Sequence, residues 1–255
     1  MRLWLNGALI EAEAARIDPA DRGFLLGDGV FETMAATGGM VPELARHYAR
    51  LCAGAALLRL PVPVSRDVLR GAISDVLMAN GLQEAALRLT LTRGPGARGL
   101  LPQPPLTPTL LLTSTQMPPA GGPLRLATST IQRDEASPLC AIKSLNYLPN
   151  ILARLEAAER GADDALLLNR AGRAAETSAA TLFVRIKGTW ITPPLSEGAL
   201  PGIRRACLLA ARRAHEAPIT ITDLAAAEAI CVGNALSLRP VAAVDGRALP
   251  CLALA

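Results

Sequence analysis

The sequence predicts two lobes of mixed α and β structure, joined near residue 120. Segments with the character of strands and of helices alternate along the whole chain of 255 residues, as in α/β (α+β) folds. Half of the residues (51%) are hydrophobic, which suffices for a core and excludes a disordered chain. Residues 118–123 are rich in proline and glycine. We therefore expect a linker there and two domains, residues 1–118 and 119–255.

The first half begins with a predicted hairpin. Apolar residues flank Asn6-Gly7, the dipeptide typical of a type I′ turn. Ser65 is a favourable N-cap for a helix that ends at Asn80-Gly81. The spacing of apolar residues predicts a further helix at residues 43–60, and strands at residues 30–36, 87–92 and 109–115.

The second half mixes helices and strands in the same way. Pro149 fits the first turn of a helix that runs to Arg160. A second helix is expected at residues 203–215, with His215 at its end. The remaining pattern predicts strands at residues 124–129, 165–168, 181–186, 190–192, 230–232 and 240–244.

The charge balance and the cysteines exclude several classes of protein. The net charge is +4, yet the arginines are scattered and only 3% of residues are aromatic, so nucleic-acid binding is not expected. No apolar stretch reaches the ~18 residues of a membrane span, and no membrane partner is expected. Five cysteines without CxxC spacing suit a reducing compartment, which predicts a cytoplasmic protein with no metal site.

A glycine-rich motif at residues 94–99 matches the dinucleotide pattern GxGxxG. That fingerprint must open a helix, whereas this one leads through Pro102 into a proline-rich loop. We therefore interpret it as a flexible loop that carries Arg98. The chain has no GxSxG motif and only two histidines, so a catalytic triad is not expected.

Lys143 is the most informative single residue, because the chain contains only one other lysine, Lys187. Lys187 lies in a predicted Lys-Gly turn, where a solvated side chain is expected. Lys143 has apolar neighbours, and desolvation lowers the pKa of an amine and makes it nucleophilic. Lys143 is therefore a candidate for a Schiff-base amine.

Several motifs together resemble the class IV aminotransferase family, the pyridoxal-phosphate enzymes of fold type IV. The lysine motif at residues 142–150 and the glutamate motif at residues 175–183 have the family's separation. Further matching segments are residues 27–33, 47–51, 161–168, 200–204 and 233–236. The resemblance extends over nearly the whole chain, and it implies two domains with the cofactor between them.

The resemblance also implies roles for individual residues. Lys143 would bind pyridoxal 5'-phosphate as a Schiff base and later act as general acid and base. Glu176 would pair with the pyridine nitrogen, and Arg50 would hold the phosphate. The phosphate site would be completed by backbone groups at a helix start and a second loop, at Ile203, Arg204, Asn234 and Ala235.

Within the family, the resemblance is greatest to aminodeoxychorismate lyase, which makes 4-aminobenzoate and pyruvate from 4-amino-4-deoxychorismate. The alternative is an aminotransferase for D-amino acids or branched-chain amino acids. Phe31 replaces the tyrosine of D-amino acid aminotransferases, and Arg204 replaces a threonine usual in aminotransferases. Residues 142–150 also resemble D-amino acid aminotransferases, so the alternative stays open. A third, non-enzymatic hypothesis is an arginine-rich protein that binds anions or nucleic acid.

The substrate in either reading is a small molecule with an amino group. Phe31 and Arg98 are the expected substrate residues, Arg98 as a ligand of a carboxylate. In the family, the loop that corresponds to residues 94–99 borders the active site at a dimer interface. The resemblance therefore implies a homodimer.

Overall fold

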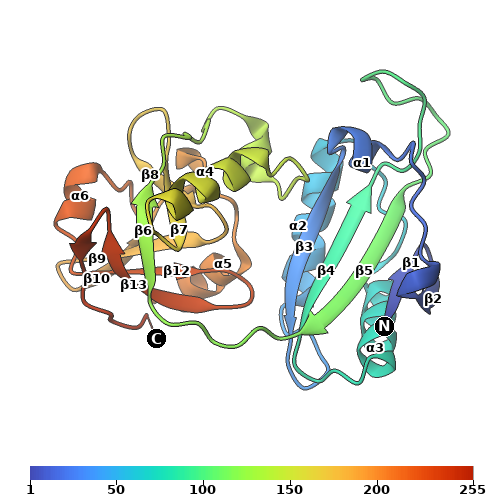
Figure 1. The fold of residues 1–255 in the computed structure, drawn as a ribbon, viewed down its shortest axis with the longest axis horizontal. Helices are drawn as coiled ribbons and strands as arrows, with labels where there is room; N and C mark the ends of the chain where they lie inside the picture. The colour runs from blue at the N-terminus through green and yellow to red at the C-terminus, as the bar shows by residue number, and fades with distance from the viewer. Residues whose placement is uncertain (255) are drawn as a thin grey trace. The chain divides into compact units, whose positions relative to one another are not determined.

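The chain begins with a hairpin of two short strands, β1 (Arg2–Leu5) and β2 (Ala8–Glu11). Asn6 and Gly7 form its turn with φ of 49° and 100°, the left-handed conformation that this dipeptide favours. The predicted hairpin is confirmed. The structure is a computed structural model that describes residues 1–254 (Figure 1).

The residues fall into two compact units that do not follow the chain strictly. The first unit contains Met1–Pro119 and also Ile142–Asn146; the second contains Ala120–Ala141 and the chain from Tyr147 onward. The predicted boundary between residues 118 and 119 lies one residue before this division. The short segment with Lys143 belongs to the first unit, whereas the sequence analysis placed this lysine in the C-terminal domain.

The first unit is built on an antiparallel sheet with the strand order β2-β1-β5-β4-β3. The three longer strands are β3 (Gly29–Ala36), β4 (Ala85–Thr92) and β5 (Thr109–Gln116). β3 pairs with β4 along its whole length, and no named strand covers its other edge. Backbone groups along that edge can therefore accept a further segment of chain.

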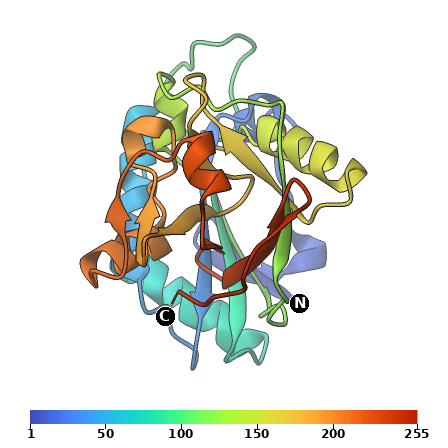
Figure 2. The ribbon, with the colours of Figure 1, turned by 90° about the vertical axis from the view of Figure 1, so that its left-hand side faces the viewer.

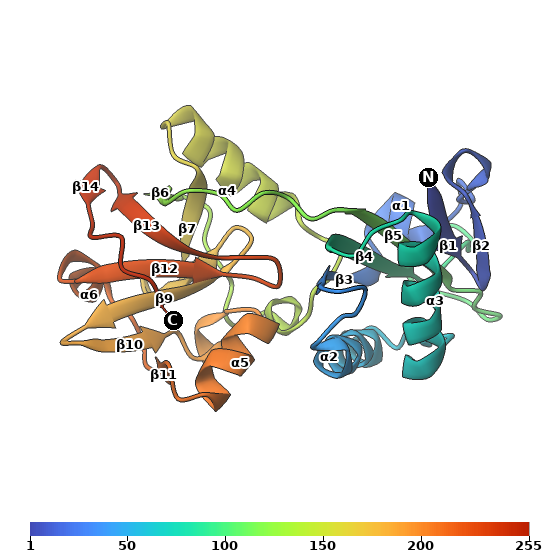
Figure 3. The same cartoon turned by 90° about the horizontal axis from the view of Figure 1, so that it is seen from below.

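Two helices cover one face of this sheet, α2 (Leu44–Leu57) on β3 and α3 (Arg66–Ala79) on β1 and β5 (Figure 3). Ser65 caps α3 as predicted, since its hydroxyl accepts a hydrogen bond of 3.2 Å from the Val68 amide. The core between helices and sheet is mainly aliphatic, with Trp4 as its aromatic member, and its fully buried members include Met34, Leu51, Val76, Leu89 and Leu112. Each such side chain contributes roughly 1.5–3 kcal/mol by its burial.

Asp21 fixes the place where the loop of residues 94–108 leaves the sheet. This fully buried carboxylate caps the short helix α1 (Arg22–Leu26) and accepts hydrogen bonds from the hydroxyls of Thr92 (2.8 Å) and Thr109 (2.7 Å). Gly94 follows with φ of 79°, and a Cβ there would meet the Thr107 carbonyl oxygen at 1.7 Å. The two ends of the loop are therefore held together.

The second unit contains a nine-stranded sheet in which parallel and antiparallel pairs mix. The order is β11-β10-β9-β12-β13-β6-β7-β8, with β14 paired to β13. Figure 2 shows the β13–β14 hairpin (red) beside β6 (green). The bounds are β6 (Leu124–Thr128), β7 (Asp164–Leu168), β8 (Ala174–Thr177), β9 (Thr181–Ile186), β10 (Thr189–Thr192), β11 (His215–Glu216), β12 (Ala229–Gly233), β13 (Leu238–Val244) and β14 (Arg247–Ala248).

Three α-helices accompany this sheet: α4 (Leu148–Glu159), α5 (Ile203–Ala210) and α6 (Ile221–Ala225). Pro149 lies in the first turn of α4, as predicted. Within residues 1–254 the chain also forms three short 3-10 helices, η1 (Ala12–Ala14), η2 (Pro138–Ala141) and η3 (Leu195–Glu197). The main core of the unit is again aliphatic, with Leu126, Leu166, Leu182, Ile230 and Val241 buried.

The prediction for residues 203–215 was wrong at its end. Helix α5 stops at Ala210, because Arg212 has φ of 54°, which an α-helix cannot continue. His215 then starts β11 and pairs in parallel with Ile191 of β10. The elements α1, α6 and β8 were not predicted from the sequence, because they have only four or five residues each and too little periodicity to be recognised.

Candidate active site

The segment with Lys143 lies against the open edge of β3. The Phe31 amide donates to the Lys143 carbonyl (2.9 Å), and the Leu145 amide donates to the Gly29 carbonyl (3.0 Å). The neighbouring residues Val30 and Ser144 form an isolated antiparallel bridge. Backbone pairing therefore fixes Lys143 on the first unit, although the chain reaches it from the second.

The Phe31 ring contacts two cations. The Lys143 ammonium lies over the ring, 4.4 Å from its centroid, and the Arg88 guanidinium carbon lies 3.8 Å from the same centroid. Both distances are in the range of cation–π attraction. The predicted residues Phe31 and Lys143 are therefore brought together, and Arg88 joins them.

Arg88 was not predicted to belong to the site. It lies on β4 within an alternating strand pattern, where an arginine is most simply a solvated residue. The register pairs Arg88 with Thr33 and Thr90 with Phe31, so Arg88 and Phe31 are diagonal neighbours on adjacent strands. This pairing, which only the folded sheet reveals, was the missing signal.

Arg50 is held by a buried carboxylate. Glu32 on β3 accepts from Arg50 Nε (2.8 Å) and Nη2 (2.6 Å), and its Oε2 also lies 2.6 Å from His47 Nδ1. The exposed fraction of the side chain is 1% for Glu32, 4% for His47 and 10% for Arg50. Burial alone would raise the pKa of Glu32, but the hydrogen bonds and charges of Arg50 and His47 lower it below its usual value.

A second, partly buried carboxylate supports the loop that carries Arg98. Asp28 accepts from Arg93 (2.7 and 2.9 Å) and from Arg22 Nε (2.9 Å). Arg22 also donates to the carbonyls of Gly99 and Leu100, both at 2.8 Å. Arg98 itself is exposed on this loop. As predicted, no helix follows the glycine-rich motif.

Glu176 lies on β8 in the second unit and is buried. Arg133 Nη2 lies 3.0 Å from its Oε1, and the Leu200 amide donates to its Oε2 at 3.0 Å. Arg133 is fixed in turn by a hydrogen bond from its Nε to the Gly198 carbonyl (3.2 Å). The carboxylate thus has a defined orientation and a cationic neighbour.

The start of α5 has the geometry of a phosphate site. Gly202 is the N-cap and offers no side chain to the first amides of the helix. A Cβ at Gly202 would lie 2.6 Å from the Thr181 hydroxyl, so only glycine lets the two segments approach this closely. Amides at such a helix start bind anions. The residues therefore fit a phosphate group.

The loop after β12 lies beside this helix start. Arg204 Nε donates to the Asn234 carbonyl at 3.4 Å, and Asn234 Nδ2 donates to the Ala179 carbonyl at 3.3 Å. The Asn234 carboxamide oxygen accepts the amides of Leu236 and Ser237, both at 3.0 Å. The structure thus brings together Arg204, Asn234 and their predicted neighbours Ile203 and Ala235.

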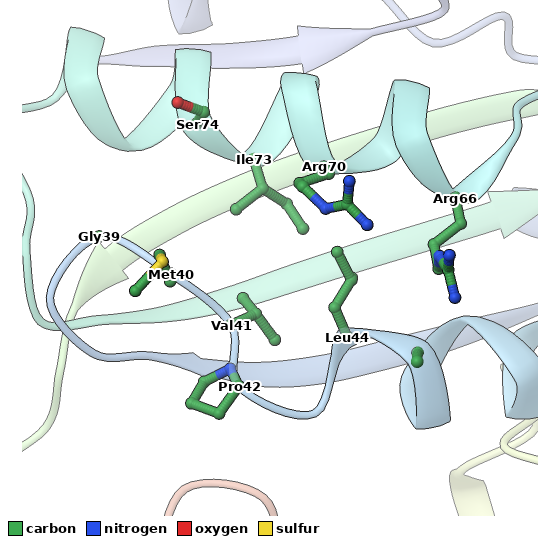
Figure 4. A pocket seen from close by; sticks show the side chains of 10 residues that line it. Gly39, Met40, Val41, Pro42, Leu44, Arg66, Arg70, Ile73 and Ser74 are labelled. Atoms are coloured by element: carbon green, nitrogen blue, oxygen red, sulfur yellow. The ribbon is translucent and has the colours of Figure 1, made fainter.

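One surface groove of the first unit is separate from these residues. It has a volume of about 470 Å³ and lies between α2, α3 and the loop that begins at Gly39 (Figure 4). Arg66 and Arg70 extend from α3 toward Leu44. None of the predicted site residues lines it. Within residues 1–254, no three histidine, cysteine, aspartate or glutamate side chains gather as metal ligands would.

Comparison with known proteins identifies the family. The family model described as amino-transferase class IV matches residues 29–244, and the chain belongs to this family. A Methanocaldococcus jannaschii protein, provisionally named a branched-chain-amino-acid aminotransferase, is 34% identical over 98% of this chain and 90% of its own length. The predicted family and its two-sheet α/β fold are confirmed.

Solved structures in this family include both candidate activities. The 4-amino-4-deoxychorismate lyase of Pseudomonas aeruginosa has a TM-score of 0.85 and 29% identity, over 99% of this chain and 94% of its own. The branched-chain aminotransferase of Thermoproteus uzoniensis, solved with norvaline, has a TM-score of 0.91 and 28% identity, over 98% and 89%.

The cofactor prediction is confirmed for the family, because a further branched-chain aminotransferase of the same fold was solved with pyridoxamine 5'-phosphate. Among residues 1–254 of this chain, no helix is long and apolar enough to cross a membrane.

The Asp28 network predicts a pH dependence of stability. Burial alone raises the pKa of Asp28, but hydrogen bonds and charges from Arg93 and Arg22 hold it below its ordinary value. Such a group stabilises the fold above the unfolded pKa of about 3.9, and this stability is lost as the pH falls through the lower folded pKa. We expect Asp28→Asn to lower the free energy of unfolding by about 3 kcal/mol at pH 7.

Urea unfolding at pH 7, 5, 4 and 3 measures this effect, and the difference between Asp28→Asn and the unmodified protein should shrink below pH 4. Asp67→Asn is the control, because Asp67 forms an exposed ion pair with Arg70 and should change stability by less than about 1 kcal/mol. If the difference in the free energy of unfolding between Asp28→Asn and the unmodified protein is the same at every pH, the pKa of Asp28 is not lowered in the folded protein.

Proposed function

We propose that this chain is a pyridoxal-phosphate-dependent enzyme that acts on an amine-bearing carboxylic acid. The observation that carries this proposal is the placement of Lys143. Backbone hydrogen bonds to β3 fix the residue, and its ammonium lies 4.4 Å from the centroid of the Phe31 ring. The membership in the class IV family supports the same assignment.

Each predicted site residue has a task in this chemistry. Bound pyridoxal phosphate supplies an electron sink for a carbanion beside the substrate amine. Lys143 would hold the cofactor covalently and would move the proton at the amine-bearing carbon of the substrate. The Glu176 carboxylate, oriented by Arg133, accepts a hydrogen bond from the protonated pyridine nitrogen.

The phosphate is held by a side chain and by backbone amides. Arg50 supplies a guanidinium that Glu32 orients, and guanidinium–phosphate hydrogen bonds are strong and directional. The amides of Ile203 and Arg204 at the start of α5, with those of Asn234 and Ala235, supply neutral donors.

For the reaction, we propose the conversion of 4-amino-4-deoxychorismate to 4-aminobenzoate and pyruvate. The substrate is a ring with two carboxylates, and the Phe31 ring beside the Arg88 guanidinium suits a cyclic anion. Arg98 is proposed as a second carboxylate ligand. Lys143 would remove the proton at the amine-bearing carbon, and the ring carbon–oxygen bond to the enolpyruvyl group would break as the ring becomes aromatic. The departing enolpyruvate takes up one proton on its methylene carbon and becomes pyruvate.

Amino-group transfer is the second candidate. It is favoured by the 34% identity to the Methanocaldococcus jannaschii protein named as an aminotransferase. The same Lys143 serves both reactions, because both begin with removal of a proton beside the amine. The reactions differ in whether the substrate carries a leaving group, and the residues around Phe31 decide which substrate is accepted.

A product assay separates the two candidates. Purified protein with pyridoxal phosphate should release 4-aminobenzoate and pyruvate in equal amounts from 4-amino-4-deoxychorismate. D-Alanine, D-glutamate and L-leucine, each with a 2-oxo acid acceptor, should give no more than traces of new amino acid. Rapid amino-group transfer from any of these donors, without formation of 4-aminobenzoate, would show that the protein is an aminotransferase and not the lyase.

Covalent labelling tests the lysine. Borohydride reduction of the cofactor-loaded protein should leave a phosphopyridoxyl group on Lys143, found by peptide mapping. Lys187 is the internal control, since it lies in the exposed turn between β9 and β10 with φ of 48°. Label on Lys187 alone, or on neither lysine, would disprove the role of Lys143.

We further propose that the protein is a homodimer in the cytoplasm. An apolar surface on α1 and the 94–108 loop supports the dimer; its exposed residues are Phe24 (76%), Leu25 (58%), Leu26 (44%), Leu100 (83%) and Leu101 (76%). Arg22 links helix and loop through its hydrogen bonds to the carbonyls of Gly99 and Leu100. Exposed apolar groups held in one place are typical of interfaces. All five cysteines are free, which supports the cytoplasmic location.

Charges placed on this surface should separate the dimer. We expect light scattering to give twice the chain mass of 26.6 kDa for the unmodified protein, and a single chain mass for Leu100→Asp combined with Leu101→Asp. Met78→Asp is the matched control, because Met78 is equally exposed (75%) on α3. A monomeric unmodified protein, or a dimer that survives the double change, would contradict this interface.

A further inference from the structure

Glu32, His47 and Arg50 form a polar cluster inside the first unit. Glu32 lies within β3, while His47 and Arg50 are three residues apart on α2, one turn of the helix, so both reach the same carboxylate. Arg50 binds both oxygens of Glu32 with two donors, at 2.8 and 2.6 Å, and His47 Nδ1 lies 2.6 Å from one of them.

The charge states in this cluster are defined by its chemistry. Hydrogen bonds and charges from Arg50 and His47 keep the pKa of Glu32 low despite its burial, so the carboxylate is ionised. An ionised carboxylate only accepts hydrogen bonds, which places the proton of His47 on Nδ1, pointing at Glu32. Both partners therefore donate to Glu32, and neither can rotate without breaking a charge-assisted bond.

A buried ion pair of this kind is a poor way to stabilise a fold, since apolar residues of similar volume usually do as well or better. Such an ion pair is, however, an effective way to fix the orientation of the arginine side chain. The guanidinium is planar, so binding Nε and Nη2 to one carboxylate determines the plane in which the rest of the group lies. The arginine side chain is otherwise long and flexible, and an unfixed one would lose more entropy on binding an anion.

We propose that Glu32 and His47 are positioning residues, which orient the Arg50 guanidinium for the phosphate of the cofactor. This inference rests on the proposed function, in which Arg50 binds that phosphate. Glu32 acts on Arg50 directly. His47 acts one step further away, because it holds the carboxylate from the other side.

The experiment compares two ligands that differ only in the phosphate. Equilibrium dialysis of the full chain, freed of cofactor, measures the dissociation constants of pyridoxal phosphate and of pyridoxal. Glu32→Gln should weaken the binding of pyridoxal phosphate about tenfold, the loss seen at metal sites when a hydrogen bond to a ligating residue is removed. It should change the binding of pyridoxal less than about twofold. A purely structural role would weaken both ligands alike.

The variants are arranged as a cycle. Arg50→Gln should show the same phosphate-specific loss, and adding Glu32→Gln to it should cause no further loss, because Glu32 acts through Arg50. Glu43→Gln is the control for a lost carboxylate, since Glu43 forms an exposed pair with Arg46 at the start of α2; it should leave both constants unchanged.

His47→Gln keeps a side chain that can donate to Glu32, and it provides the test if Glu32→Gln does not fold. We expect it to weaken the binding of pyridoxal phosphate about threefold, less than Glu32→Gln does. The binding of pyridoxal should again not change. Equal losses of affinity for both ligands, or additive losses in the double variant, would overturn the positioning role of Glu32 and His47. The proposed phosphate role of Arg50 would not be affected by that result. If the unmodified protein does not prefer pyridoxal phosphate to pyridoxal, the phosphate role of Arg50 falls as well, before any variant is considered.

Discussion

The alternation of side chains along β3 is the constraint on which the site depends. Successive residues of a strand point to opposite faces of its sheet. Phe31 therefore contacts Lys143 and Arg88, while its neighbour Glu32 reaches α2 and binds Arg50. The free edge of the same strand holds the backbone of Lys143. A shift of one residue in the register of β3 would exchange these two roles and remove the site.

Burying charge inside the first unit carries an energetic cost that apolar packing would avoid. Two carboxylates of this unit, Glu32 and Asp28, each bind at least one arginine. Arg50, which binds Glu32, is the proposed ligand of the cofactor phosphate. Arg22 passes from Asp28 to the loop that bears Arg98. The buried ion pairs therefore connect the rigid sheet with the parts that are proposed to meet ligands.

The sequence was sufficient for most elements with a clear local signal. The Asn-Gly hairpin, the Ser65 cap and the Pro149 helix start depend on neighbouring residues alone, and all three were predicted correctly. Contacts between residues that are far apart in the sequence were not predicted. The partnership of Arg88 with Phe31 depends on strand register, and the unit to which Lys143 belongs depends on a strand edge. Roles that came from family motifs, such as that of Glu176, required resemblance as well as local physics.

The return of residues Ile142–Asn146 to the first unit affects how the protein can be made. A ribosome delivers the chain from its amino terminus, and domains generally fold in that order. The first unit is not complete when Pro119 emerges, because the strand-edge segment follows only after part of the second unit, Ala120–Ala141. The edge of β3 therefore stays uncovered until residues 142–146 have been synthesised. For the same reason, a single cut of the gene cannot yield two intact halves.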